Sequence, residues 1–272
     1  MRKFALALSL MIPVLSVAQT CHDANASFVA MAEDESFVNA HELPAVNDED
    51  YRGGIIFFDT DGERARGYKV DAREETDKWI LIFHEWWGMN PNIIRETQDL
   101  CEHLGVNVLA IDLYDGQIAT TREEASALMQ GANPERIQAI IDGAFDYIGE
   151  SARVGTIGWC FGGGWSLQAA LIGSNQVDAC VMYYGMPESD VERLSTLNAP
   201  VLGIFANQDQ WINPDVVADF ESNMDSAGEE LTVYSYDAQH AFANPSNEGV
   251  YNEEAARDAR EKAYDFFREN LL

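Results

Sequence analysis

A cysteine set between glycines is the residue of this chain that could do the most distinctive chemistry. Cys160 lies in the run Gly158-Trp159-Cys160-Phe161-Gly162, which follows one apolar segment and precedes another. Glycines around a nucleophile allow the tight strand-to-helix turn known as a nucleophile elbow. A helix that begins at Phe161 would direct unpaired backbone N–H groups and its positive dipole end at the sulfur, which favours a thiolate. The run therefore predicts a cysteine nucleophile for acyl transfer.

Two other interpretations of this run compete with a nucleophile. Gly158 and Gly162 to Gly164 would also suit close packing around a small buried thiol, which is the usual state of a free cysteine. A phosphate-binding loop is disfavoured, because the run lacks both a Gly-Lys-Ser/Thr ending and the G-x-G-x-x-G spacing. The partners that the rest of the chain offers to the sulfur favour the nucleophile.

A cysteine nucleophile needs a base and a carboxylate that orients the base. Asp209 follows a buried-strand pattern at residues 200–206, and His240 follows a second strand pattern at residues 231–236. Both come after Cys160, in the order nucleophile, acid, histidine. We therefore expect His240 to be the base and Asp209 to be the acid.

Several other residues compete for these two roles. The chain has five histidines, of which His22 and His41 lie in a polar amino-terminal region and His103 lies on a helical pattern. That leaves only His84 and His240 beside strand ends. For the acid, Asp215 or Asp237 would be alternatives, since 46 acidic residues make an aspartate in a loop a common feature.

A carboxylate follows the first strongly apolar run. Residues 80–83 are all apolar, and Glu85 comes directly after His84 and before Trp86 and Trp87. Apolar surroundings raise the pKa of a carboxyl group, because burial penalises its charged form. We expect Glu85 to lie in such surroundings, with a structural carboxylate held by backbone N–H groups as the alternative.

Together these segments resemble the dienelactone hydrolase family of α/β-hydrolases. The similar region runs from about residue 51 to the carboxyl terminus, and four stretches carry it: His84-Glu85-Trp86-Trp87-Gly88, Gly158-Trp159-Cys160-Phe161-Gly162-Gly163, Asp209, and His240-Ala241-Phe242. The resemblance implies a nucleophile at Cys160, a base at His240 and an orienting acid at Asp209. It also implies that Glu85 keeps the resting thiol protonated until substrate arrives and then receives its proton.

The oxyanion hole and the substrate pocket follow from the same segments. We expect the backbone N–H groups of Trp86 and Phe161 to form the oxyanion hole, one before and one just after the nucleophile. The candidate pocket residues are His84, Trp87, Trp159, Phe242 and Asn244. In family members that act on dienelactones, an arginine stands four positions after the catalytic histidine, where this chain has Asn244. An amide cannot form the bidentate ion pair that a substrate carboxylate needs, so we expect a natural substrate other than dienelactone.

The composition and the amino terminus indicate where the protein is located and which partners it does not bind. The charged start at residues 1–3, the apolar run at 4–14 and the small residues at 16–18 predict a signal peptide over residues 1–18 and export to a bacterial periplasm. No membrane insertion is expected after cleavage, because the apolar run is too short to span a bilayer.

A formal net charge of −29 repels nucleic acid and anionic membranes, so neither is an expected partner. The oligomeric state is not determined by these features.

The remaining cysteines indicate neither a metal centre nor a disulfide framework. Cys101 lies on a helical pattern and Cys180 lies in a strand pattern, so both are expected to be buried thiols, while Cys21 lies too near the new terminus to place. No paired C-x-x-C and no His/Cys cluster is present in the sequence, so no metal and no cofactor is expected.

Strands are expected at residues 79–83, 106–111, 153–158, 179–184, 201–206 and 231–236, and helices at 95–104, 122–130, 135–148, 165–171, 215–226 and 253–270. This alternation predicts a single-domain α/β-hydrolase fold over residues 51–272, with a mostly parallel central sheet and helices on both faces. Residues 19–50 are expected to form an acidic arm, extended or partly disordered.

We therefore expect an exported hydrolase that forms an acyl-enzyme at Cys160 on a small-molecule ester, lactone or thioester. A carboxylesterase or thioesterase of other specificity is the alternative within enzymes. A non-catalytic binding protein or thiol sensor on the same fold is the alternative from another class.

Overall fold

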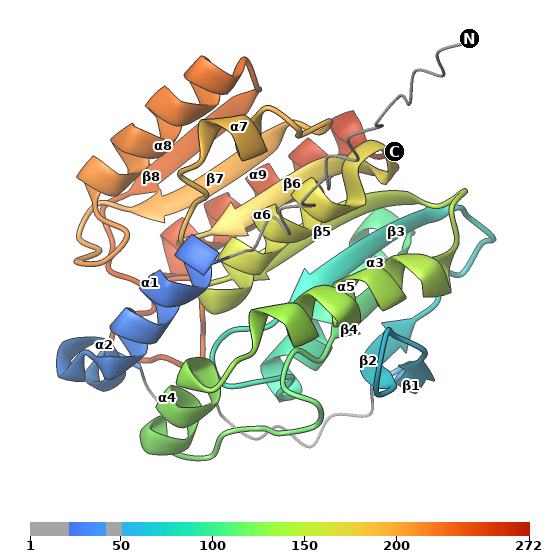
Figure 1. Ribbon diagram of the computed structural model, residues 1–272, viewed down its shortest axis with the longest axis horizontal. Coiled ribbons are helices and arrows are strands. Elements are labelled where there is room, and N and C mark those ends of the chain that lie inside the picture. The colour runs from blue at the N-terminus through green and yellow to red at the C-terminus, as the bar shows by residue number, and fades with distance from the viewer. Residues whose placement is uncertain (1–21, 42–50) are drawn as a thin grey trace, which may run out of the picture.

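A mostly parallel sheet of eight strands forms the centre of the molecule (Figure 1). The computed structural model describes residues 22–41 and 51–272. The strand order is β1-β2-β4-β3-β5-β6-β7-β8. Strands β1 and β2 pair antiparallel with each other, and β2 pairs antiparallel with β4, whereas all remaining pairs are parallel. The strands are β1 Gly54–Phe58, β2 Ala65–Val70, β3 Lys78–Phe83, β4 Asn107–Ile111, β5 Arg153–Trp159, β6 Val177–Tyr183, β7 Val201–Ala206 and β8 Leu231–Tyr236.

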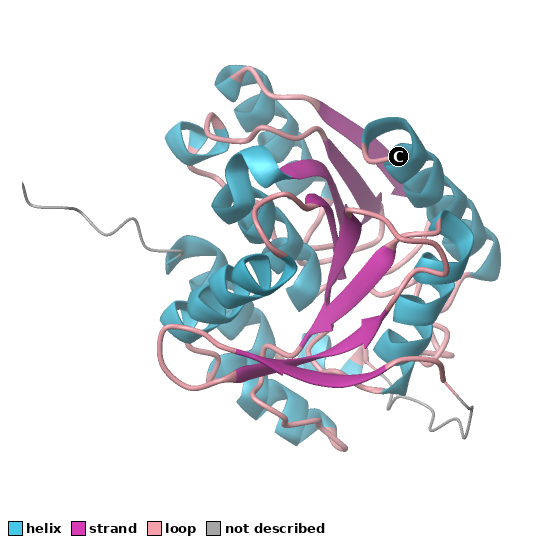
Figure 2. Ribbon diagram, turned by 90° about the vertical axis from the view of Figure 1, so that its right-hand side faces the viewer, coloured by secondary structure: helices cyan, strands magenta, loops and turns pink. Residues whose placement is uncertain are grey.

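Helices cover both faces of this sheet (Figure 2). They are α1 His22–Glu33, α2 Glu35–Asn39, α3 Pro91–Leu104, α4 Arg122–Gln130, α5 Pro134–Ile148, α6 Phe161–Gly173, α7 Val191–Leu194, α8 Pro214–Ala227 and α9 Glu253–Asn270, with a short 3-10 turn, η1 Ser174–Gln176, before β6. Helix α3 packs against α9, and α5 packs against α6. The inner strands are apolar on both sides because helices bury both faces, as parallel sheets require.

Three of the longer helices begin with the same two-residue signal. Asn90, Asn133 and Asn213 each precede a proline, and each asparagine side chain accepts hydrogen bonds from the first free backbone N–H groups of its helix. Asparagine satisfies these donors, and proline at the first helical position needs no donor of its own. The start of these helices is therefore fixed by local sequence.

The predicted fold is confirmed, and all six predicted strands lie within two residues of their observed ends. Strands β1 and β2 were not expected. They extend the sheet at one edge. β1 carries an apolar run from Ile55 to Phe58 in which Ile55 and Phe57 are exposed, and β2 mixes polar and apolar residues, so neither has the fully buried apolar pattern of the inner strands. The helices α1, α2 and α7 were also not expected.

The prediction of an extended or disordered arm is wrong for residues 22–41. This segment forms α1 and α2, which pack against α4 beyond the ends of the parallel strands (Figure 1). Phe28, Met31 and Ala32 recur at helical spacing and are buried, which explains why the segment folds despite its acidic composition. The predicted signal peptide, Cys21 and residues 42–50 lie outside the described residues. No described helix is long and apolar enough to cross a membrane.

Candidate active site

Cys160 occupies a sharp turn between β5 and α6. Its backbone has φ 55° and ψ −119°, a left-handed conformation that side chains other than glycine rarely adopt. The glycines around it allow the close approach that the turn requires. A Cβ at Gly158 would lie 2.0 Å from the Gly162 carbonyl oxygen, and a Cβ at Gly162 would lie 2.1 Å from the Phe83 carbonyl oxygen. The structure therefore has the strained strand-to-helix turn that the sequence predicts.

His240 and Asp209 form a short, buried pair. Asp209 lies just after β7 and His240 lies in the loop after β8, so both stand at the carboxyl ends of neighbouring strands. The distance from His240 Nδ1 to Asp209 Oδ2 is 2.6 Å. The other carboxylate oxygen accepts backbone N–H groups from Trp211 at 2.9 Å and Ile212 at 3.0 Å. The carboxylate is thereby held in one orientation and holds the imidazole in turn.

The same imidazole also lies beside the thiol. A ring nitrogen of His240 and Cys160 Sγ belong to a buried cluster whose ligand atoms all lie within 4.8 Å of one another. Burial lowers the pKa of His240, but the Asp209 carboxylate and the Cys160 sulfur outweigh burial, so the net shift is upward. Burial also opposes the charged form of Asp209, but His240 and the two N–H groups outweigh it and lower the pKa of this carboxyl.

Glu85 lies in the loop after β3 and is buried, as predicted for a carboxylate in apolar surroundings. Burial raises its pKa to about 7, although His240 and the Asn244 amide oppose this shift. Asn244 Nδ2 donates to Glu85 Oε2 at 2.5 Å, while Glu85 Oε1 has no hydrogen-bond partner among the described residues. Asn244 is thus a partner of Glu85, a role that the sequence did not indicate.

Burial is the largest influence on the protonation of the Cys160 thiol. It raises the pKa of the Cys160 thiol, and the charge of Glu85 adds to the increase. His240 and the Phe161 backbone N–H oppose both effects, because they stabilise a thiolate. The net upward shift keeps the resting thiol protonated at neutral pH.

The other predicted residues surround this centre. Trp86, Trp87, Phe161 and Phe242 are fully or almost fully buried, and Trp159 is 9% exposed. Trp86 packs edge-on against Trp87 with ring centroids 5.0 Å apart. Phe242 packs between Tyr184 and Tyr236. The oxyanion-hole roles of Trp86 and Phe161 stay predictions.

His84 supports the loop of Glu85 and does not offer a free nitrogen to a pocket. Its Nδ1 lies 2.7 Å from the Glu85 carbonyl oxygen, and its Nε2 accepts the Leu113 N–H at 3.0 Å. Because both nitrogens bind backbone groups, the structure assigns His84 a structural position in place of the expected pocket position.

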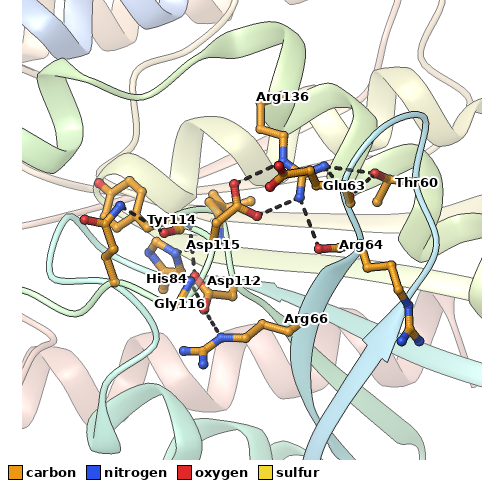
Figure 3. A network of polar contacts seen from close by, with 12 residues as sticks. Thr60, Glu63, Arg64, Arg66, His84, Asp112, Tyr114, Asp115, Gly116 and Arg136 are labelled. Carbon is orange, nitrogen blue, oxygen red and sulfur yellow. Dashed lines mark hydrogen bonds and ion pairs between the residues drawn. The ribbon is translucent and has the colours of Figure 1, made fainter.

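A polar network holds the neighbouring loop after β4 (Figure 3). Asp112 is fully buried and pairs with Arg66 Nε at 2.6 Å. Its carboxylate also accepts the N–H groups of Tyr114 and Gly116, each at 3.0 Å. At the end of the loop, the N–H of Ala119 donates to the Trp87 carbonyl oxygen. The Asp112 network therefore fixes the loop against which the Glu85 loop rests.

The amino-terminal helices close the site from outside. We call residues 22–41 the cap. Phe37 is fully buried, and its ring lies 5.2 Å from Trp86, 5.0 Å from Trp211 and 5.5 Å from His240 between centroids. Phe28 packs edge-on against Phe161 at 5.3 Å. Cys160 has no exposed surface beneath this cover.

His41 ends the cap and is the site residue that sequence reasoning missed. Its ring lies 4.6 Å from Trp86 and 5.4 Å from His240 between centroids. Burial and the charge of His240 lower its pKa to about 3, so it is neutral. The polar residues around His41 hid it in the sequence. The helical spacing of Phe28, Met31 and Ala32 was the available signal that this segment packs on the domain.

Comparisons with known proteins agree with this geometry. Residues 66–271 match the dienelactone hydrolase family. A putative carboxymethylenebutenolidase of Aquifex aeolicus is 29% identical over 235 residues, which cover 80% of this chain and 99% of the relative. The protein usf of Aquifex pyrophilus is 30% identical over 234 residues, with the same coverage.

A solved structure shares the fold. The crystal structure of a putative dienelactone hydrolase from Klebsiella pneumoniae superposes with a TM-score of 0.65 at 22% identity, and covers 79% of this chain and 99% of that one. The family match begins at residue 66, so the cap lies outside it.

Proposed function

Because this chain belongs to the dienelactone hydrolase family and is a hydrolase of ester or lactone bonds, we propose that it acts through a thioester at Cys160. The observation that supports it is the 2.6 Å contact between His240 Nδ1 and Asp209, next to a buried thiol. Asp209 can thus orient the base His240 beside the nucleophile Cys160, which is the spatial arrangement that a catalytic triad uses for acyl transfer.

The proton balance follows from the two groups beside the sulfur. Cys160 gives up its proton as it attacks the substrate carbonyl carbon, and His240 receives this proton, either directly or through Glu85. The carbonyl oxygen becomes an oxyanion, which the N–H groups of Trp86 and Phe161 would stabilise. The tetrahedral intermediate then expels the alkoxide, which takes a proton from His240. Water activated by His240 hydrolyses the thioester and restores the thiol.

We infer a small substrate without a carboxylate next to the reacting carbonyl. The support is that Asn244 stands where the family arginine is expected, and that its amide is already bound to Glu85. A second carboxylate in this pocket would meet Glu85 without a cation to pair with. Neutral esters and lactones avoid that cost.

We also propose export of the protein, with cleavage after residue 18. The support is the charged start, short apolar run and small residues of the first 18 positions. Amino-terminal sequencing of protein from the periplasm of an expressing bacterium should give Gln19 as the first residue. A product that retains Met1 would contradict export.

Turnover of a panel of neutral esters and lactones tests the mechanism. Cys160→Ala should reduce kcat to background while the circular dichroism spectrum is kept. His240→Ala should reduce kcat more than Asp209→Asn, because the acid mainly orients the base. Mass spectrometry of wild-type protein quenched during turnover should find the acyl group on Cys160. Activity of Cys160→Ala equal to wild type would overturn the nucleophile assignment.

A further inference from the structure

Three side chains with metal-binding atoms meet where the cap touches the site. One ring nitrogen of His41, one of His240 and Cys160 Sγ lie within 4.8 Å of one another, and all three residues are buried. Each Nδ1 is already engaged, at 2.8 Å from the Phe37 carbonyl oxygen for His41 and at 2.6 Å from Asp209 for His240. Nε2 is therefore the available nitrogen in both rings. Neither Nε2 has a nitrogen or oxygen partner among the described residues.

These Nδ1 contacts match those of histidines that bind metals. A ligating imidazole normally donates its other N–H to a carboxylate or a backbone carbonyl, which orients the ring and leaves the free nitrogen unprotonated. Asp209 supplies such a carboxylate, and Phe37 supplies such a carbonyl. The aromatic rings of Phe37 and Trp86 pack against His240 and His41, which lowers the local dielectric constant and strengthens electrostatic attraction.

A thiolate with two imidazoles is a donor set that favours Zn²⁺. We propose that Cys160, His41 and His240 form a Zn²⁺ site, and that Zn²⁺ bound there inhibits the enzyme; the inhibition rests on the proposed function. Zn–S bonds of about 2.3 Å and Zn–N bonds of about 2.0 Å require the donors to approach by roughly 1 Å, with water as the fourth ligand. Cys160 loses its thiol proton to solvent on binding, and His240 loses any proton that Nε2 carries.

Inhibition follows from which atoms the metal would occupy. Zn²⁺ takes the sulfur lone pair that would attack the substrate and the Nε2 that would carry the proton. His41 adds a bond between the cap and the nucleophile turn, so the metal also holds the cap in place. The third ligand, His41, lies before the residues that match the family, and it distinguishes this site from zinc binding by a cysteine and histidine pair alone.

Binding of Co²⁺ can be measured from its absorption bands, so the metal site can be tested without any substrate. Co²⁺ added to reduced wild-type protein should produce a sulfur-to-cobalt charge-transfer band and the intense visible bands of tetrahedral coordination, and Zn²⁺ should displace both. Cys160→Ala should abolish the charge-transfer band. His41→Phe keeps an aromatic side chain but has no ring nitrogen, so it should weaken Co²⁺ and Zn²⁺ binding by at least about tenfold. His103→Phe, on an exposed histidine of α3, is the matched control.

Zn²⁺ inhibition then tests the consequence. Wild type and His103→Phe should lose ester turnover on preincubation with Zn²⁺ and regain it with EDTA, while His41→Phe should need at least about tenfold more Zn²⁺, each relative to its own metal-free rate. No charge-transfer band in the wild type, or the same Zn²⁺ dependence in folded His41→Phe, would overturn the site. The cobalt bands remain measurable if no ester is turned over, so failure of the proposed function is distinguished from failure of the metal site.

Discussion

At the scale of single residues, the charge of the Glu85 carboxylate disfavours the thiolate form of Cys160. The pKa of Glu85 is raised to about 7 by burial, and its charge adds to the raised pKa of Cys160. Below pH 7 Glu85 is mostly neutral and does not oppose the thiolate. Above pH 7 it is charged, and repulsion makes the thiolate less favourable.

We expect Glu85→Gln to increase the rate of Cys160 alkylation by iodoacetamide above pH 7 and to change it little at pH 5.5. Turnover of a good ester should fall, because Gln cannot receive the thiol proton. Alkylation rates against pH, with labelling of Cys160 confirmed by mass spectrometry, give the measurement. Glu150→Gln, on an exposed residue, is the control. Equal alkylation rates at pH 8 in Glu85→Gln and wild type would leave Glu85 a structural carboxylate.

Among the elements, we expect the cap to limit the access of reagents to the nucleophile. Phe37 is its central anchor, since its ring touches Trp86, Trp211 and His240. Two further contacts attach the cap to the domain: Trp211 Nε1 donates to Asp34 at 3.1 Å, and Ser126 Oγ donates to the Ala32 carbonyl oxygen at 2.6 Å. Cys160 is fully buried beneath this cover, so we expect substrate to enter when the cap moves.

Phe37→Ala should therefore make Cys160 alkylate at least about tenfold faster, because truncating a buried phenylalanine costs roughly 3–5 kcal/mol and here that cost falls on the closed cap. The rate of iodoacetamide labelling at a fixed pH measures this opening. Phe57→Ala, on a half-exposed residue of β1, should leave the rate unchanged. If Phe37→Ala labelled no faster than wild type, the cap would not limit access.

The loop after β4 is the second element that the site depends on. Asp112 is buried and paired with Arg66, and it also holds two backbone N–H groups of its loop (Figure 3). Asp115 in the same loop pairs with Arg136 at 2.6 Å, but its side chain is 43% exposed. Substitution of the buried Asp112 can therefore be compared with substitution of the exposed Asp115 in the same loop.

Asp112→Asn should lower the free energy of unfolding by about 3 kcal/mol, because it leaves the Arg66 charge without its buried partner. It should also lower kcat more than it changes KM, since the Trp87 loop loses its fixed neighbour. Asp115→Asn should cost less than about 1 kcal/mol. Urea unfolding and steady-state kinetics measure both effects. Equal losses in the two variants would show that burial does not govern this network.

On the scale of the whole molecule, the charge of −29 acts on every anion that approaches. We expect esters that carry a carboxylate to show a kcat/KM at least about tenfold below that of neutral esters of the same size at low ionic strength. Sodium chloride should narrow the gap, because the screening length falls from about 10 Å at 0.1 M to about 3 Å at 1 M. Neutral esters should show no such salt dependence. An anionic ester whose kcat/KM does not rise with salt would contradict long-range repulsion.

The sequence by itself determined the six parallel strands of the sheet, the nucleophile turn and the candidate triad. Apolar runs, Asn-Pro helix starts and glycines around Cys160 are local signals, since each depends on neighbours within a few positions. The carboxyl ends of parallel strands meet at one edge, so placing Asp209 and His240 after two late strands was enough to predict that they lie together. Burial around Glu85 was predictable for the same local reason.

Only the tertiary structure decided which residues from distant parts of the chain contact the site residues. His41 and His240 are 199 positions apart, and Glu85 and Asn244 are 159 apart, so no spacing in the chain indicates their contact. The strands β1 and β2 are set in the sheet by tertiary pairing: β1 is a partly exposed apolar run at the edge, and β2 mixes polar and apolar residues and pairs with both β1 and β4. The cap folds because Phe28 and Phe37 fill space above the site, and that space exists only once the domain has formed.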